Sequence, residues 1–368
     1  MLQFMIFFTF IFILVDAVVY SALVNFWGLL LFPISLAFLW LAIKIQPIKE
    51  IDESKIVGWN IGAGLEVENP DECKKVDVTL DDNSLNLGGM FIGGPGSGKS
   101  VAATGQKQYF ITSRPKCGYA SFDGKGDFDI YQKDISAGAV PDYFFSSELS
   151  GSDTINVMDA PTDAVIDYLS RVLVGSESEY YGSAQKTAIR KILPLIKAFD
   201  CSCNLLDLWA ALTVPECADY LLNRAKNDGV SVDIISTAEQ YFLQDEKDRL
   251  QIIDGLLNKL YPFVSGVLKD RLNAYEPTLN LSDAVNEGKR IYFHMPYSDS
   301  SKAVATMITE QLGVIAKARQ LDVSKNRDVY PLLYDDWGAF FYDNFGPFTA
   351  RCRSAKMPIS FFFQSRGQ

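Results

Sequence analysis

One short run of residues constrains the fold of this chain more than any other: Gly93 to Ser100, which reads GGPGSGKS. It fits the spacing G-x-x-x-x-G-K-[ST], with Gly93, Gly98, Lys99 and Ser100 at the fixed positions. Glycines let backbone N–H groups close around an anion, and a helix that starts there adds its positive N-terminal end. An apolar segment precedes the run and a helical pattern follows it. The sequence therefore predicts a strand, a phosphate-binding loop (the P-loop) and a helix, in that order.

Each residue type in such a loop has its own chemistry. The Lys99 ammonium would reach the β- and γ-phosphates of a nucleotide, and the Ser100 hydroxyl would be a ligand of Mg²⁺. We therefore expect ATP and Mg²⁺ as cofactors. The residues expected to contact the nucleotide are Gly93, Gly94, Gly96, Ser97, Gly98, Lys99, Ser100 and Val101.

A second group of candidate residues follows two apolar segments near the C-terminus. A P-loop works with an acid at the end of a neighbouring strand and a group that positions water. Asp335 and Asp336 follow Leu332 to Tyr334, so we expect Asp335 to hold Mg²⁺ and Asp336 to polarise water. Asp336 is one methylene shorter than the Glu that ring ATPases usually carry there. Gln364 follows another apolar segment and would face the γ-phosphate, so the expected catalytic set is Lys99, Asp335, Asp336 and Gln364.

The first 45 residues have the composition of a membrane anchor. Leu2 to Ile43 is almost wholly apolar. One crossing needs ~20 apolar residues, so the run is long enough for two, and we expect helices at about 3–23 and 27–43. A cleaved signal peptide is disfavoured because the run has no basic start and continues far beyond an ordinary signal. Lys44 and Lys49 follow the second helix, which predicts a multi-pass protein with most of the chain in the cytoplasm.

Composition narrows the remaining classes. The net charge of −11 falls entirely on the part after the anchor, which disfavours a simple nucleic-acid-coating protein. The six cysteines form no C-x-x-C pair and there is one histidine, so neither a zinc site nor a disulfide framework is expected. His294, in a buried type of strand, is interpreted as a core residue and not as a catalytic one.

Beyond the anchor, short apolar strands alternate with helices, which indicates an α/β fold with a parallel sheet. Before the P-loop, Ile61 to Gly64 carries turn signals and Val76 to Leu80 alternates like a strand. Further strands are expected at Tyr119–Asp123, Tyr143–Phe145, Arg290–Met295, Tyr330–Asp336 and Ile359–Phe363.

The pattern is interrupted between 162 and 285, where helical spacing replaces the strand signal. Helices are expected at 164–174, 181–199, 205–212, 217–226, 234–244 and 248–273. We therefore predict three parts: a two-helix transmembrane anchor (1–45), a nucleotide-binding domain in two segments (46–161 and 286–368), and an all-α domain inserted between them (162–285).

Several motifs together resemble one family. Gly93–Ser100, the run Phe122 to Asp127 (FDGKGD), Leu332–Asp336 and the segment Arg353 to Ser365 are similar to those of the type IV coupling proteins, the VirD/TraG/TraD-type ATPases. The DGKGD version looks closest to the type IVB-like branch. The two-helix anchor and the inserted all-α block also match that family, so the resemblance covers nearly the whole chain.

The resemblance implies a RecA-like P-loop domain in a hexameric ring at the bacterial inner membrane. Such ATPases use ATP hydrolysis to bring relaxase-bound single-stranded DNA, or effector and adaptor proteins, to the channel of a type IV secretion or conjugation system. The all-α domain is implicated in recognising that cargo. The family continues beyond the point that corresponds to Gln368, so the resemblance also implies a C-terminally incomplete domain.

Two other functions are compatible with the sequence. One is a double-stranded DNA translocase of the FtsK/HerA kind, and the other is a membrane scaffold that binds ATP without hydrolysing it. A ring ATPase also needs an arginine from a neighbouring subunit, which must lie near the ligand edge of the sheet. Arg351 and Arg353 are the preferred candidates, and Arg366 is a further one.

Overall fold

The computed structural model describes residues 59–65, 75–114, 117–126, 128–174, 179–199, 201–322, 328–340, 342 and 345–364. The predicted anchor, residues 1–45, lies outside these ranges. Within them, none of the helices combines the length and the apolar character that a membrane crossing requires.

The centre of the fold is a six-stranded sheet in which every neighbouring pair is parallel. All carboxyl ends therefore meet at one edge, as the predicted α/β class requires. In spatial order the strands are β3 (Gly89–Ile92), β8 (Ile359–Phe363), β7 (Leu332–Asp335), β4 (Tyr119–Asp123), β6 (Arg290–His294) and β5 (Tyr143–Ser146). The strand prediction is confirmed, because these are the short apolar runs that the sequence singled out.

The strand order corrects one expectation. Asp335 ends a strand that does not neighbour the P-loop strand, because β8 lies between β3 and β7. The ring of Phe362 in β8 stacks on that of Phe91 in β3, with centroids 4.6 Å apart. This contact joins the last described strand to the first strand of the sheet, a long-range pairing that no local pattern reveals.

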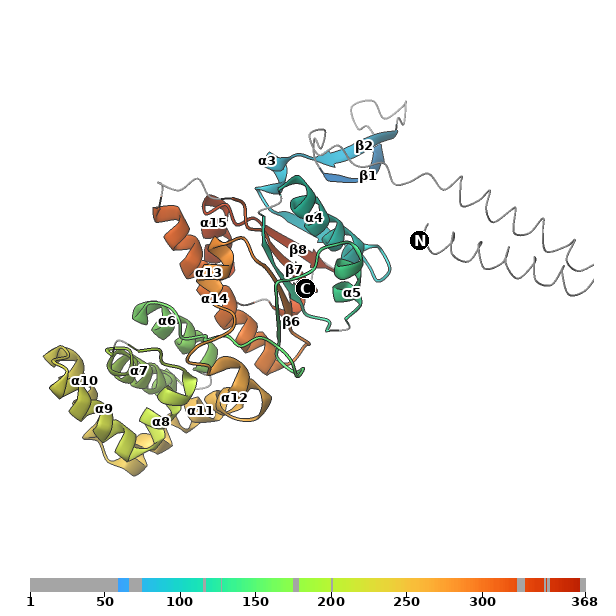
Figure 1. Cartoon of the computed structure of the whole chain (residues 1–368). Coiled ribbons are helices and arrows are strands. Elements are labelled where there is room, and N and C mark those ends of the chain that lie inside the picture. The colour runs from blue at the N-terminus through green and yellow to red at the C-terminus, as the bar shows by residue number, and fades with distance from the viewer. Residues whose placement is uncertain are drawn as a thin grey trace, which may run out of the picture. The chain divides into compact units, whose positions relative to one another are not determined.

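Helices cover both faces of the sheet (Figure 1). One face carries α4 (Lys99–Ser113) and α5 (Asp129–Ser136), and the other carries α14 (Asp299–Leu321) and α15 (Phe345–Ser354). Successive strand residues point to opposite faces, so Tyr119, Leu333 and Phe362 pack under α4 while Phe122, Tyr334 and Phe361 pack under α14 and α15. This two-sided burial explains why the strands are continuous apolar runs.

One edge of the sheet differs from the rest. Along β3 the side chains of Met90 and Ile92 are 70% and 51% exposed, and Leu87 just before the strand is 60% exposed. Among the described elements β3 pairs with β8 alone. The edge strand thus presents apolar side chains to solvent.

The helical block lies in the chain between β5 and β6, as predicted. Its helices are α6 (Thr162–Leu173), α7 (Glu179–Ile196), α8 (Leu205–Thr213), α9 (Pro215–Asn227), α10 (Val232–Phe242), α11 (Glu246–Val264), α12 (Gly266–Leu272) and α13 (Leu281–Asn286). The single helix expected at 248–273 is wrong. Ser265 is extended and Gly266 has a φ of +60°, a conformation that ends α11 and starts α12 in a new direction.

The block and the sheet share one hydrophobic core. Buried side chains run without interruption from Phe122 and Phe293 in the sheet to Leu208 and Leu256 in the helices. Residues 57–368 form one compact unit. The helical block is therefore not a separate compact unit in the structure. Its treatment as a domain of its own, residues 162–285, stays a prediction.

The segment before the P-loop folds differently from the expectation. Ile61 to Gly64, predicted as a turn, lies inside strand β1 (Trp59–Leu65), which pairs antiparallel with β2 (Lys75–Leu80). The register shifts between Asn60 and Gly62, a bulge of the kind that a glycine accommodates. A short helix, α3 (Asp82–Leu85), then leads into β3.

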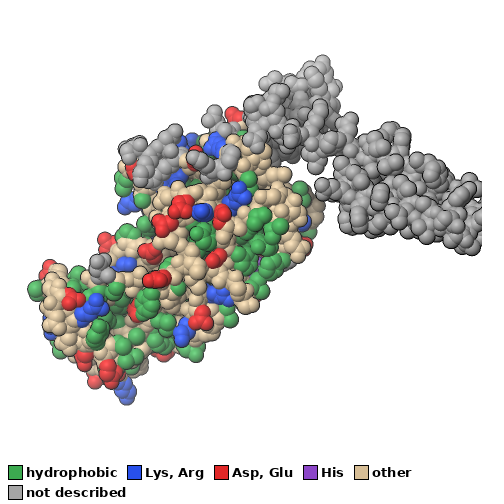
Figure 2. Space-filling model, viewed as in Figure 1, with side chains coloured by type: hydrophobic (Ala, Val, Ile, Leu, Met, Phe, Trp, Pro, Cys, Tyr) green, Lys and Arg blue, Asp and Glu red, His purple; other side chains and the backbone are tan. Residues whose placement is uncertain are grey.

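Charged side chains on the surface are mixed in sign. On the face shown in Figure 2, Lys and Arg lie among Asp and Glu instead of forming a separate patch.

Candidate functional site

The P-loop connects the end of β3 to the start of α4 at the carboxyl edge of the sheet. Gly96 and Gly98 have φ values of +76° and +89°, which side chains rarely adopt. A Cβ on Gly93 would lie 2.2 Å from the Ser97 hydroxyl oxygen, so a larger residue there would force the Ser97 side chain to move. Residues 94 to 98 are exposed. The sequence spacing is thus explained by a tight loop open to solvent just before a helix N-terminus.

The two polar residues after the loop lie where the motif predicts. The Lys99 ammonium folds over the loop and donates to the carbonyl oxygens of Gly93 (2.9 Å) and Gly94 (3.4 Å). The Ser100 hydroxyl lies in the first turn of α4 and donates to Asp335 Oδ2 at 3.5 Å. Two residues 235 positions apart in the sequence are therefore brought together at the carboxyl edge.

Asp335 is buried at the end of β7, with 6% of its surface exposed. Burial raises the pKa of its carboxyl group to about 6, and the nearby charges of Asp336 and Asp123 act in the same direction. The N–H of Asp336 donates to Asp335 Oδ1 (3.1 Å). A carboxylate that is costly to ionise in this way is stabilised in its charged form by a nearby cation.

Asp336 has a left-handed backbone, with a φ of +51°. Aspartate is among the few residues with a side chain that tolerate this conformation. The turn lets the Asp336 carbonyl accept from the N–H of Ala339, which starts the 3₁₀ turn Trp337–Ala339. The acid pair therefore sits at a sharp change of chain direction, at the ligand edge of the sheet.

Gln364 follows β8 directly, and the carbonyl of the preceding Phe363 accepts from the N–H of Gly93 (3.1 Å). This bond places Gln364 beside the first residue of the P-loop. Val101, in the first turn of α4, is 64% exposed. The structure thus gathers Lys99, Ser100, Asp335, Asp336 and Gln364 at the carboxyl ends of three neighbouring strands.

One further acid at this edge, Asp123, had no role predicted from the sequence. The buried carboxylate of Asp123 ends β4, in register with Asp335 on the next strand. It accepts from the N–H groups of Lys125 (3.0 Å) and Gly126 (3.1 Å) and from the Tyr292 hydroxyl (2.8 Å). The sequence feature that could have identified this residue is an acid at a strand end followed by Gly-x-Gly. Asp127, the last residue of that motif, lies outside the described residues.

The loop after Asp123 is fixed from several sides. Gly124 donates its N–H to the Asp335 carbonyl (3.3 Å), and His294 Nε2 is 3.0 Å from the Gly126 carbonyl oxygen. The other ring nitrogen of His294, Nδ1, is 2.9 Å from the Ser146 hydroxyl. His294 is therefore a buried residue that joins the loop after β4 to the end of strand β5, in agreement with its interpretation as a core residue.

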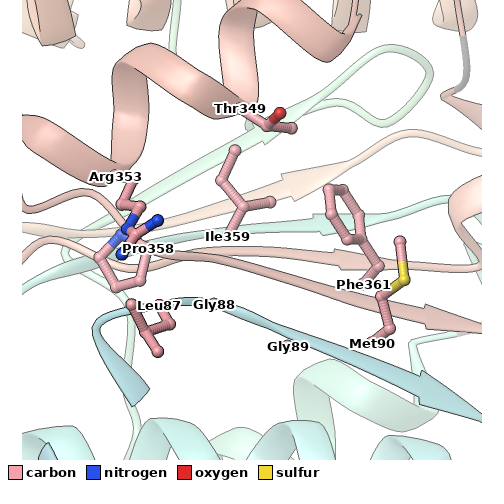
Figure 3. Close-up of a pocket in the computed structure, with 9 residues that line it drawn as sticks. All are labelled: Leu87, Gly88, Gly89, Met90, Thr349, Arg353, Pro358, Ile359 and Phe361. Atoms are coloured by element: carbon pink, nitrogen blue, oxygen red, sulfur yellow. The ribbon is translucent and has the colours of Figure 1, made fainter. Parts of the chain in front are cut away.

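The preferred arginines do not meet the condition set for them. Arg353 lines a groove of about 300 Å³ together with Leu87, Gly88 and Pro358, which precede β3 and β8 (Figure 3). The carbonyl of Arg351 accepts from Gln320, at the end of α14. Both arginines therefore lie at the amino edge of the sheet, opposite the P-loop. The expected placement of these two arginines near the ligand edge was wrong, because the segment 345–354 is a helix, α15, that leads to the amino edge where β8 begins. Arg366, the further candidate, lies outside the described residues.

Comparison with known proteins agrees with this geometry. The chain matches the bacterial conjugative coupling protein TrwBdeltaN70 in complex with sulphate, with a TM-score of 0.51 and 13% identity over 78% of this chain and 66% of that one. It matches the plasmid coupling protein TrwB in complex with ADP and Mg²⁺ at a TM-score of 0.50, again with 13% identity and the same coverage.

The chain has the fold of a type IV coupling protein. The α/β fold with a parallel sheet that the motif resemblance implied is therefore confirmed for the described residues. No family model matches the sequence, and no curated protein matches it at a significant level. The chain spans 66% of the length of these two coupling-protein structures, and at 13% identity the likeness concerns the fold.

Proposed function

We propose that this chain binds and hydrolyses ATP as the coupling ATPase of a type IV secretion or conjugation system. The observation that carries the proposal is the meeting of the P-loop serine, Ser100, with the buried acid Asp335 at the carboxyl edge of a coupling-protein fold. A structure of TrwB, whose fold the chain shares, contains ADP and Mg²⁺.

The residues at this edge fit a nucleotide and its metal. The main-chain N–H groups of Gly94, Gly96 and Gly98, which lie in the exposed loop, and the Lys99 ammonium suit phosphate oxygens. The Ser100 hydroxyl and the Asp335 carboxylate are the oxygen ligands that Mg²⁺ prefers. When bound, Mg²⁺ neutralises charge that develops on the phosphates during transfer. Its charge would also stabilise the ionised form of Asp335.

Two further residues are proposed to act on water and on the γ-phosphate. Asp336 adjoins Asp335 and would polarise the attacking water. Gln364, beside the start of the P-loop, would contact the γ-phosphate. Asp336 is short and sits on a left-handed turn, which also supports the second candidate function, a scaffold that binds ATP without turnover.

The test is the release of phosphate from ATP by the full-length protein, with Mg²⁺ and with excess EDTA. Coupling ATPase activity predicts Mg²⁺-dependent turnover that Asp336→Asn reduces at least tenfold. Binding of ATP with no turnover would favour the scaffold, and Asp336→Glu would then be the variant expected to gain hydrolysis. No binding of ATP would overturn both functions.

The coupling part of the proposal concerns the anchor and the ring. Residues 1–45 are proposed to hold the protein in the bacterial inner membrane as two helices, with a hexameric ring in the cytoplasm. Deletion of residues 1–50 is expected to release the protein from membranes, because no other apolar run in the sequence approaches ~20 residues. Continued membrane partitioning of the truncated protein would contradict the anchor.

Cargo recognition is assigned to the helical block, residues 162–285. The proposed partners are a relaxase–single-stranded DNA complex or an effector or adaptor protein, and the channel components that receive it. Exchange of the block between related proteins is expected to change the cargo and to leave ATP binding intact. The shared core between block and sheet means that the exchange must keep the buried contacts of Phe293 and Val304.

A further inference from the structure

A fully buried ion pair lies beneath the P-loop helix. The ammonium of Lys107 in α4 and the carboxylate of Asp134 in α5 contact each other, and both side chains have 0% of their surface exposed. Lysine and aspartate are almost never fully buried unless paired. Neither residue belongs to the nucleotide site described above, so the pair requires its own explanation.

Further polar and aromatic groups surround the pair. The Thr104 hydroxyl donates to Asp134 Oδ1 at 2.6 Å. The Lys107 ammonium also lies 5.6 Å from the ring centroid of Tyr292 and 5.8 Å from that of Tyr119. The Tyr292 hydroxyl donates to Asp123. A continuous series of buried contacts therefore runs from the third turn of α4 to the strand end that neighbours Asp335.

The spacing of these residues along α4 places them on the same face of the helix as Ser100. Ser100, Thr104 and Lys107 are four and three residues apart, so they lie on one stripe of the helix. The first of them contacts Asp335 and the other two contact Asp134. One face of α4 therefore carries both the Ser100 hydroxyl, which contacts Asp335 at the end of β7, and the residues that contact Asp134.

Energetics favours a positional role over a stabilising one. Burying two charges removes their hydration, and apolar residues of similar volume often stabilise a protein as well as a buried ion pair does. What a buried pair adds is a fixed geometry, because its two charges tolerate no slippage in a dry interior. Here it fixes α4 against α5, the helix that begins just after the loop held by Asp123.

We propose that Lys107 and Asp134 are positioning residues for metal binding. Their contact sets the rotation and the height of α4 over the sheet, and so keeps the Ser100 hydroxyl within reach of the Asp335 carboxylate. Nucleotide binding by the loop depends less on the position of α4 over the sheet. The main-chain N–H groups of the loop and Lys99 keep their positions relative to one another when the helix shifts. The inference rests on the proposed function and deepens it.

The experiment replaces the pair with apolar residues in the full-length protein, Lys107→Met together with Asp134→Leu. The matched control is Lys133→Met, since Lys133 is exposed on the same helix as Asp134. Three quantities are measured: the unfolding temperature, the affinity for ADP in EDTA, and the Mg²⁺ concentration that gives half-maximal ATP hydrolysis. We expect the first two to match the parent and the third to rise about tenfold or more, as for residues that orient metal ligands.

An unchanged Mg²⁺ requirement in the folded double variant would overturn the proposal, and so would an equal loss of ADP affinity in EDTA. Should the double variant fail to fold, Thr104→Val removes one bond to Asp134 without changing side-chain volume, and it must raise the Mg²⁺ requirement about threefold for the proposal to stand. A parent protein that binds no ADP would instead overturn the proposed function, an outcome recognised before any variant is made.

Discussion

The first and the third turns of helix α4 hold their polar side chains in opposite ways. In the first turn Lys99 and Ser100 are half-buried, and their bonds are to loop carbonyls and to an acid at 3.5 Å. In the third turn Lys107 is dry, ion-paired to Asp134 and flanked by two tyrosine rings. The contrast shows how one helix separates two tasks. The groups expected to exchange partners with a ligand are partly exposed to solvent, while the groups that set geometry are buried and ion-paired.

The comparison predicts that single changes in the first turn mainly lower activity, whereas removal of one partner of the buried pair in the third turn mainly lowers stability. The largest expected effect is that of Lys99→Ala. It removes the charge that meets the β- and γ-phosphates, so phosphate release should fall to background while the unfolding temperature stays the same. A full-length Lys99→Ala protein that hydrolyses ATP at the parental rate would disprove the P-loop assignment.

Single replacement of Lys107 should have the opposite signature. Lys107→Ala leaves the Asp134 carboxylate buried without its cation, and such a change costs about 3–5 kcal/mol of unfolding free energy. Urea unfolding of the parent and the variant, monitored by circular dichroism, measures the difference. A loss below about 1 kcal/mol would mean that water reaches the pair, and the contrast between the two turns would fail.

The pH dependence of stability tests Asp335, the buried acid that the first turn of α4 contacts. Because the pKa of Asp335 rises from its ordinary 3.8 to about 6 on folding, the folded chain binds a proton more tightly than the unfolded chain. The contribution of Asp335 to stability is therefore greatest below pH ~4 and is lost as the pH rises through 6. Ionised Asp335 then costs about 3 kcal/mol in the absence of a cation.

Asp335→Asn should accordingly stabilise the protein at pH 7.5 without Mg²⁺, by up to about 3 kcal/mol, and the gain should disappear by pH 4. Thermal unfolding across this range in EDTA provides the measurement. The same variant should lose ATP hydrolysis, which would identify Asp335 as a residue whose position is unfavourable for folding but required for activity. An asparagine variant that is less stable than the parent at pH 7.5 would contradict the raised pKa.

The smallest expected effects come from two hydroxyls on the same stripe of α4. Thr104→Val removes a 2.6 Å bond to a buried carboxylate and should cost about 1.5–3 kcal/mol. Ser100→Ala removes a 3.5 Å contact in a half-buried position and should change stability by less than about 0.5 kcal/mol while hydrolysis falls. Equal losses of stability in the two variants would remove the distinction between the turns.

Local patterns in the sequence were sufficient for the parts of the site that lie within one element. The P-loop spacing located its glycines, and apolar runs located the strands that end in Asp335 and Phe363. Because the carboxyl ends of parallel strands share one edge, these predictions also implied that the residues meet.

The local patterns could not predict the order of the strands in the sheet or the positions of residues far apart in the sequence. Nothing local shows that β8 enters between β3 and β7, or that α15 carries Arg353 to the far edge of the sheet. Lys107 and Asp134 look like solvated charges on two helices until α5 is docked on α4. The break at Gly266 was missed because a glycine within a helical pattern is often tolerated.

Among the described elements β3 has a partner strand on one side only, and this has a consequence for how the protein behaves at high concentration. Natural sheets protect their edges with charges, prolines or bulges, whereas Leu87 to Ile92 contains none of the first two and pairs regularly with β8. An edge strand that exposes Met90 and Ile92 can pair with the same strand of a second molecule. The protein should therefore self-associate and precipitate as its concentration rises. Met90→Lys would place a positive charge on that edge, and repulsion between the charged edges should raise the solubility of the protein.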